Sequence, residues 1–219
     1  MSIPHSLVAL QRPVITTLVG SAAAVTVLGL GHAELQEGLL MSPEAFRTAP
    51  WRLLTWTLPH EGLVQLFIAM FWTWTLGSEL EGRLGHLRVL ALVALLASAT
   101  GSAEYLFGGH GTGLSGIAFG LFGFVLAAKD RAPSPAMVAS FVVWGSMSAV
   151  LTARGQVEAP IFAQALGLTF GLALGAARAA AGARRLVLSQ AVVVAFVAVV
   201  VGSVYSESGA LLASLNLSF

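Results

Sequence analysis

The sequence has no cysteine and little charge. None of its 219 residues is cysteine, and only 10% are Asp, Glu, Lys or Arg, against about 25% in typical soluble proteins. The missing cysteines exclude disulfide bonds, thiolate metal ligands and a cysteine nucleophile. Because 11 basic residues face 10 acidic ones, the net charge is +1, which excludes the basic surface that nucleic-acid binding requires.

What the sequence has in excess is apolar residues, which make up 57% of the chain and give a mean hydropathy of +0.85. This composition excludes a soluble domain and a disordered chain. Seven apolar runs fit membrane helices, which need about 20 residues. They cover residues 13–30, 62–78, 87–107, 114–128, 136–152, 160–177 and 186–205. We therefore predict an all-α polytopic membrane protein, and we expect the first run to be retained because it is longer than a signal peptide needs.

Basic residues indicate the orientation of these helices, because cytoplasmic loops are enriched in Lys and Arg. With the N-terminus inside, eight basic residues lie on the inner side and three, Arg47, Arg52 and Arg154, on the outer side. The inner eight are Arg12, Arg83, Arg88, Lys129, Arg131, Arg178, Arg184 and Arg185. This bias predicts a cytoplasmic N-terminus and a C-terminus outside.

Three polar residues lie near the starts of the second, fourth and sixth predicted helices, which all run from the outer face inward. They are Gln65, Ser115 and Gln164. A polar side chain inside a membrane is costly unless it is paired, and it marks a functional site by default. We therefore expect these three side chains to lie at one level of the bilayer.

The fourth predicted helix, 114–128, is short. At 1.5 Å per residue it spans about 22 Å, less than the hydrocarbon core of about 30 Å. It follows the glycine-rich residues 108–113, and irregular backbone occurs at this depth only when protein buries it or when it lines a wet cavity. We expect Ser115 at a helix N-terminus below the outer surface, facing a wet pocket.

Four short motifs occur in order between residues 51 and 175. They are Trp51-Arg52, Glu81-Gly82-Arg83-Leu84-Gly85, Gly113-Leu114-Ser115-Gly116, and the segment from Gln164 through Gly167 to Gly171. The two glycines of the last motif are spaced so that another helix can approach closely. Together the motifs resemble the WR pair, the E-x-R-x-G segment, the GxSG nucleophile signature and the HxxGxxxG helix of the rhomboid intramembrane serine proteases.

The resemblance implies a rhomboid-like six-helix bundle over residues 1–180, with an added transmembrane helix in residues 181–219. It also implies a protein of the bacterial plasma membrane that contacts the lipid bilayer and recognises transmembrane segments of other proteins entering between its helices. No metal, other cofactor or nucleic acid is expected. The resemblance assigns a structural role to Trp51, Arg52, Glu81, Arg83, Gly167 and Gly171. We expect Glu81 and Arg83 to form a polar network at the inner face.

The sequence departs from the family at the catalytic positions. Gln164 stands where the resemblance puts the histidine that activates Ser115, and an amide can hydrogen-bond the serine but cannot accept its proton. The family's oxyanion-stabilising histidine and asparagine correspond to Gln65, which can still donate a hydrogen bond, and Ala69, which cannot. The whole oxyanion region comprises Gln65, Ala69, Gly113 and Leu114. We therefore predict a protein that binds membrane partners with little or no proteolysis.

The alternative is an active intramembrane serine endopeptidase in which His110 or His60 acts as the base for Ser115. It is disfavoured because general-base catalysis needs a hydrogen bond of about 2.6 to 3.2 Å, which a glycine-rich loop rarely holds in place. In the simpler, non-catalytic interpretation, His110 and His60 are solvent-accessible histidines at the membrane interface, and Ser115 caps its helix. A transporter or channel is a third class, disfavoured because the predicted spans contain almost no charge.

Overall fold

Every regular element that the computed structural model describes is an α-helix, as predicted. The structure describes residues 11–40, 48–106, 112–128, 133–156 and 159–181, together with Val187 and Gln190. The long helices are α2 (Pro13–Gly29), α6 (Leu63–Leu84), α7 (His86–Leu106), α8 (Ser115–Ala128), α9 (Pro135–Ala153) and α10 (Ile161–Ala181). The short helices are α3 (Ala33–Glu37) and α5 (Arg52–Thr55). The seventh predicted span, 186–205, falls outside the described residues apart from Val187 and Gln190.

Four of these helices, α6, α7, α9 and α10, are long and apolar enough to cross a membrane, and α2 and α8 are shorter apolar helices. The prediction of a polytopic helical membrane protein is confirmed. The largest difference from the predicted ends is in α6, which continues from 78 to Leu84. It continues because Leu76, Leu80 and Leu84 keep one face buried at helical spacing, and it ends at Gly85, whose φ of +85° leaves the helical region.

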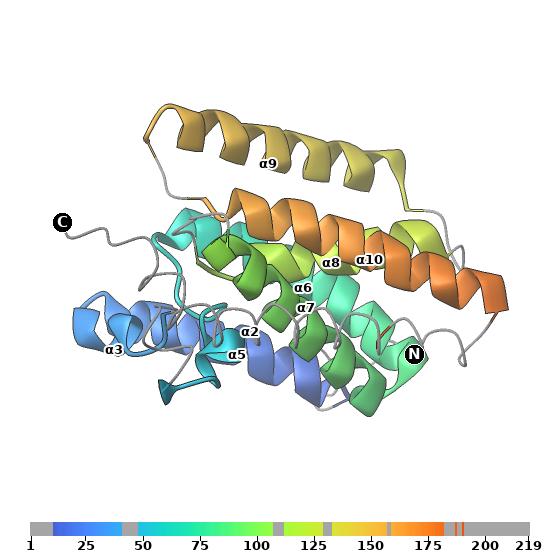
Figure 1. Ribbon diagram of the computed structural model, residues 1–219, viewed down its shortest axis with the longest axis horizontal. Helices are drawn as coiled ribbons and strands as arrows, with labels where there is room; N and C mark the ends of the chain where they lie inside the picture. The colour runs from blue at the N-terminus through green and yellow to red at the C-terminus, as the bar shows by residue number, and fades with distance from the viewer. Residues whose placement is uncertain are drawn as a thin grey trace, which may run out of the picture.

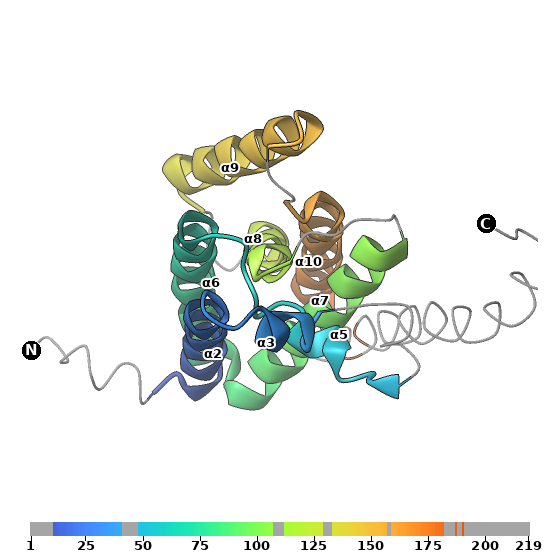
Figure 2. The same ribbon diagram turned by 90° about the vertical axis from the view of Figure 1, so that its left-hand side faces the viewer.

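Helix α8 lies at the centre of the bundle. Figure 2 looks along it and shows α6 and α10 on either side, with α9 standing apart from the others. Residues Ser115–Val125 of α8 are all buried, whereas the described buried side chains of α9 are Phe141, Trp144 and Ser148. Figure 1 shows α9 running above α10 along its length. Helix α9 is thus the least enclosed of the four long apolar helices.

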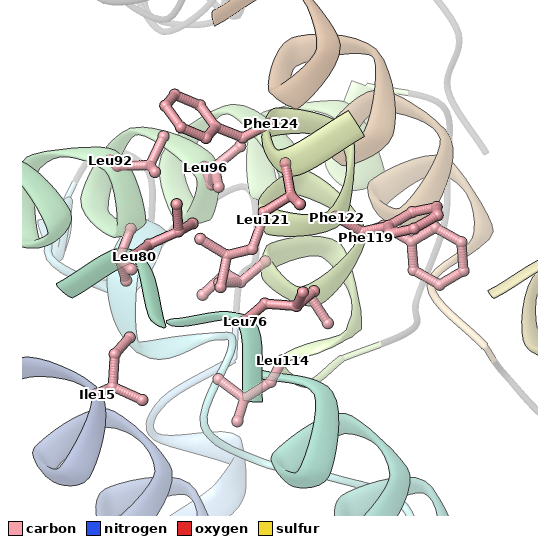
Figure 3. Packing of buried hydrophobic residues seen from close by; sticks show 14 of the residues in the cluster. Ile15, Leu76, Leu80, Leu92, Leu96, Leu114, Phe119, Leu121, Phe122 and Phe124 are labelled. Atoms are coloured by element: carbon pink, nitrogen blue, oxygen red, sulfur yellow. The ribbon is translucent and has the colours of Figure 1, made fainter. Parts of the chain in front are cut away.

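Apolar side chains from α2, α6 and α7 surround the central helix. Figure 3 shows them converging on α8 from several elements. The labelled residues are Ile15, Leu76, Leu80, Leu92, Leu96, Leu114, Phe119, Leu121, Phe122 and Phe124. Because these side chains are almost completely buried, they fix the position and rotation of α8, and with it the position of Ser115.

Helices α8 and α10 share the most extensive contact in the described part of the chain. Gly167 and Gly171 of α10 face the carbonyl oxygens of Gly116 and Gly120, so closely that a Cβ atom at either position would collide with the α8 backbone. A Cβ on Gly116 would also lie 3.1 Å from the Cβ of Ala163. The start of α10, including Gln164, is therefore packed beside the start of α8.

Two buried carboxylates hold the first turns of helices at opposite ends of the bundle. Glu81 accepts hydrogen bonds from the backbone N–H groups of Val14 and Ile15, both at 3.0 Å, at the start of α2. Glu104 of α7 accepts one from the N–H of Ala163, at 2.8 Å, in the first turn of α10. A carboxylate at a helix N-terminus satisfies free N–H groups and complements the helix dipole.

Residues around Glu81 complete the polar cluster at its end of the bundle. The Nδ1 atom of His86 lies 2.7 Å from Glu81 Oε1, and Arg83 forms an ion pair with Glu79 at 3.5 Å. At the other end, Arg52 donates from Nη1 to the carbonyl oxygen of Leu40 at 3.2 Å. The Trp51-Arg52 motif, through Arg52, and the motif that begins at Glu81 thus each connect a helix to the backbone of another segment.

Replacing Glu81 with glutamine is expected to lower the free energy of unfolding by about 2 kcal/mol. The amide is neutral and has one oxygen, so the N–H groups of Val14 and Ile15 both lose a charged acceptor and one of them loses its acceptor altogether. Unfolding by SDS titration in detergent micelles measures the loss. The matched control is Glu79→Gln, which removes an ion pair whose side chains are about one third exposed and should cost about 0.5 kcal/mol. Equal losses in the two variants would contradict the capping role.

Candidate functional site

Ser115 begins the central helix α8 and is 1% exposed. The turn before it depends on Gly113, whose φ is +103°. The hydroxyl oxygen of Ser115 has no hydrogen-bond partner among the described residues, so it does not cap the helix. Within the part of the chain that the structure describes, the site therefore contains a buried serine hydroxyl to which no base or other acceptor is hydrogen-bonded.

His60 holds the turn that leads into Ser115. Its Nε2 accepts a hydrogen bond from the backbone N–H of Leu114 at 3.1 Å, and its Nδ1 lies 2.9 Å from the carbonyl oxygen of Leu58. These partners require a neutral ring with its proton on Nδ1. The side chain of Thr26, near the end of α2, lies 3.3 Å from the same Nδ1. A Cβ on Gly113 would come within 2.7 Å of the ring, so glycine is required there.

This position of His60 corrects the expectation of a solvent-accessible histidine, because the residue is 2% exposed. Burial lowers the pKa of His60 from its ordinary 6.5 to about 4, although the hydrogen bond to Leu58 acts in the opposite direction. The ring is neutral at pH 7, but both of its nitrogens already have backbone partners. The N–H of Leu114, part of the predicted oxyanion region, is likewise occupied by His60.

The buried ring should make stability depend on pH. Between the unfolded pKa of 6.5 and the folded pKa of about 4, the unfolded chain binds more protons than the folded one. The contribution of His60 is therefore complete above pH 6.5 and falls by up to about 1.4 kcal/mol per pH unit towards pH 4, about 3 kcal/mol in all. Unfolding of wild type and His60→Gln at pH 7.5 and 4.5 tests this. A stability difference between the two proteins that does not shrink at low pH would refute it.

The two glutamines form hydrogen bonds to different neighbours. Gln164, 4% exposed, donates from Nε2 to the hydroxyl of Ser148 on α9 at 3.3 Å. Gln65 donates to the carbonyl oxygen of Thr112 at 3.2 Å, and its Oε1 accepts from the N–H of Glu61 at 3.3 Å. Gln164 does not form the hydrogen bond to Ser115 of which an amide is capable, because its amide donates to Ser148 on α9 instead.

The remaining predicted site residues lie as follows. Ala69 is fully buried in the core and supplies no hydrogen-bond donor from its side chain. His110 lies outside the described residues. Among the residues that the structure describes, no group of three or more His, Asp and Glu side chains could hold a metal ion.

A cleft of about 380 Å³ lies between α6 and α9, with the start of α10 at its back. Its walls are largely apolar, and its polar residues include Gln65, Ser148 and Gln164. The apolar lining comprises Val64, Ile68, Trp144, Met147, Leu151 and Ala159. Ser115 is not part of the lining. The cleft is therefore a mostly apolar groove whose polar groups are amides, a hydroxyl and the carboxylate of Glu61.

Ser148 and Glu104 hydrogen-bond the first turn of α10 but were not predicted as site residues. Both are polar residues inside predicted apolar runs, 136–152 and 87–107. A polar residue within a membrane span needs a partner, which is why Gln65 was predicted as a site residue. The same reasoning applies to Ser148 and Glu104.

The family model described as "Rhomboid domain" matches residues 47–181. The chain belongs to the rhomboid family. The match contains the four motifs and helices α5 to α10, so the resemblance found in the sequence is confirmed. Helix α2 precedes the matched rhomboid domain but packs into the same core through Ile15 and Ala22.

Curated relatives of this rhomboid-family chain carry the name "Rhomboid protease GlpG". Those of Yersinia pestis, Yersinia pseudotuberculosis and Photorhabdus laumondii are each 34% identical over 84 residues. The aligned segment is 38% of this chain and 30% of each relative's length. The chain thus spans about a third of the length of the rhomboid proteases it matches.

Proposed function

We propose that this rhomboid-family protein binds transmembrane helices of partner proteins in the cleft between α6 and α9, with little or no proteolytic activity. One observation carries the proposal: Gln164 occupies the position of the family's base, and its amide donates to Ser148 rather than contacting Ser115. Ser115 is thus retained with no proton acceptor hydrogen-bonded to it among the described residues.

The chemistry of serine attack explains why this loss matters. The hydroxyl of Ser115 must give up its proton as its oxygen bonds to a carbonyl carbon, and a base must take that proton. An amide is not protonated at usable pH. Ala69 supplies no oxyanion donor, and the N–H of Leu114 donates to His60. One oxyanion donor raises the rate of reaction by about 100 to 1,000-fold, and the base raises it by several powers of ten. Losing both therefore leaves little catalysis.

The cleft supports binding of a helix. Its apolar walls suit a transmembrane segment, and α9, which forms one wall, is the least enclosed of the four long apolar helices. The basic residues favour a cytoplasmic N-terminus in a bacterial plasma membrane, which would place Ser115 towards the outer face. In this arrangement a partner helix enters the cleft sideways from the lipid.

The second candidate is an intramembrane serine endopeptidase, favoured by the names of the relatives and by the retained serine. His110 is its remaining base, because both ring nitrogens of His60 have backbone partners. Loss of activity on His110→Ala, with activity retained in Gln164→Asn, would support this candidate.

A fluorophosphonate probe separates the two functions. The protein, reconstituted in liposomes, is incubated with the probe and with a helical transmembrane substrate, next to Ser115→Ala. We expect equal background labelling, no cleavage in either protein, and crosslinking of the helix to both. Labelling or cleavage in wild type that disappears in Ser115→Ala would overturn the proposal.

A further inference from the structure

Helix α9 is held by an aromatic cluster in its first half. Phe141 stacks on Phe122 of α8, with ring centroids 4.0 Å apart and planes at 1°, and it meets Phe119 edge-on at 5.1 Å. Trp144 packs on Phe119 at 5.0 Å, and Trp72 of α6 packs on Phe141 at 4.9 Å. Figure 3 shows Phe119 and Phe122 projecting from the same side of α8. This aromatic cluster fixes the first half of α9 against α6 and α8.

The second half of α9 borders the cleft instead. Beyond Trp144, the residues Met147, Ser148 and Leu151 line it. Here the Gln164–Ser148 hydrogen bond, 3.3 Å long, crosses from α10 to α9. The half of α9 that lines the cleft is therefore held by hydrogen bonds rather than by stacked rings: this one to α10, and one of 3.2 Å from the N–H of Ala159, just before α10, to the hydroxyl of Thr152.

Of the two partners in this hydrogen bond, Gln164 is the one whose neighbouring backbone is held in place. The N–H of the preceding residue, Ala163, donates to the buried carboxylate of Glu104 at 2.8 Å. One turn later, Gly167 packs directly on the α8 backbone. If a helix entered the cleft and displaced α9, Ser148 would move away from Gln164, because Gln164 is held through Ala163 and Gly167.

A buried amide that loses its hydrogen-bond acceptor in an apolar environment raises the free energy of the protein unless another acceptor replaces the lost one. Both partners are buried, Ser148 at 7% and Gln164 at 4% exposure, so water does not replace the lost hydrogen bond freely. A helix that displaces α9 therefore binds best when it brings its own oxygen acceptor to the depth of Gln164.

We propose that Gln164 selects the occupant of the cleft: a transmembrane helix with a hydroxyl or carboxamide side chain at this depth, which replaces Ser148 as the hydrogen-bond acceptor. This inference rests on the proposed function, because it assumes that the cleft binds helices. In this protein the residue at the base position thus acts in recognition instead of proton transfer.

Cysteine crosslinking tests the inference, since the natural chain has no thiol. Val64 lines the cleft and is 75% exposed, so Val64→Cys supplies one reactive group at its edge. The full chain is reconstituted in liposomes with a synthetic Leu/Ala transmembrane peptide of about 22 residues that carries one cysteine. One peptide has Asn at the depth of Gln164, and its matched control has Leu there.

We expect the Asn peptide to crosslink about threefold to tenfold more than the Leu peptide, the range for one hydrogen bond between membrane helices. Gln164→Leu should abolish this preference. Ser148→Ala, which removes the internal competitor, should keep or increase it. Equal crosslinking of both peptides, or a preference that survives Gln164→Leu, overturns the inference and leaves helix binding intact. If neither peptide crosslinks, because lipid or a second copy of the chain fills the cleft, the proposed function fails as well.

Discussion

Gln164→His is expected to make Ser115 react with a fluorophosphonate at least about 1,000-fold faster than it does in the wild type. The base of a serine protease raises the reaction rate by up to about a millionfold. Gln164→His does not restore the missing oxyanion donors, so only part of this rate is regained. Position 164 suits the change because Ala163 packs beside Gly116, the residue after Ser115, and Glu104 fixes the turn. The new imidazole has the reach of the present amide but can accept a proton.

Labelling rates in detergent measure this gain. Gln164→Asn is the matched control, because it changes the side chain at the same position without adding a titratable group, and it should remain unreactive. Combining Gln164→His with Ser115→Ala should abolish the labelling and so assign it to the serine. The rate should rise with pH as the new histidine loses its proton. Equal rates for Gln164→His and Gln164→Asn would contradict the placement of residue 164 beside Ser115.

The spans were predictable from sequence because membrane insertion depends on hydropathy, a local property. Six apolar runs correspond to α2, α6, α7, α8, α9 and α10, with ends that differ by a few residues. The end of α6 was not predicted, because Glu79, Glu81 and Arg83 break the apolar pattern there. The helix continues since Glu81 is buried against α2, more than 60 residues away in sequence, and such a contact leaves no local signal.

The positions of Gln65, Ser115 and Gln164 along the bundle were predictable, but their hydrogen bonds were not. Gln65, Ser115 and Gln164 stand near the starts of three helices that begin at the same end of the bundle, and this follows from topology. Which neighbour each amide bonds to depends on helix rotation and side-chain torsion. Gln164 therefore bonds Ser148, and His60, considered in the sequence as a base, holds the backbone of Leu114.

Gly171→Leu is expected to destabilise the protein by at least about 4 kcal/mol, the largest stability effect that we predict. Overpacking usually costs about 1 to 3 kcal/mol, when neighbouring side chains can shift. At Gly171 even a Cβ atom overlaps the carbonyl oxygen of Gly120 and lies 2.9 Å from the backbone nitrogen of Phe124. Backbone atoms of a fully buried helix cannot move aside, so α8 and α10 must separate.

Gly20→Leu is the matched control for this substitution. Gly20 lies within α2, is exposed, and would meet nothing within 4 Å of an added Cβ. There leucine should be neutral or stabilising by about 1 kcal/mol, because glycine is a weak helix former. SDS titration compares the two variants with wild type. Since separating α8 from α10 also moves position 164 away from Ser115, Gly171→Leu should remove the reactivity gained by Gln164→His. Retention of both stability and that reactivity would show that the glycine contact does not position the site.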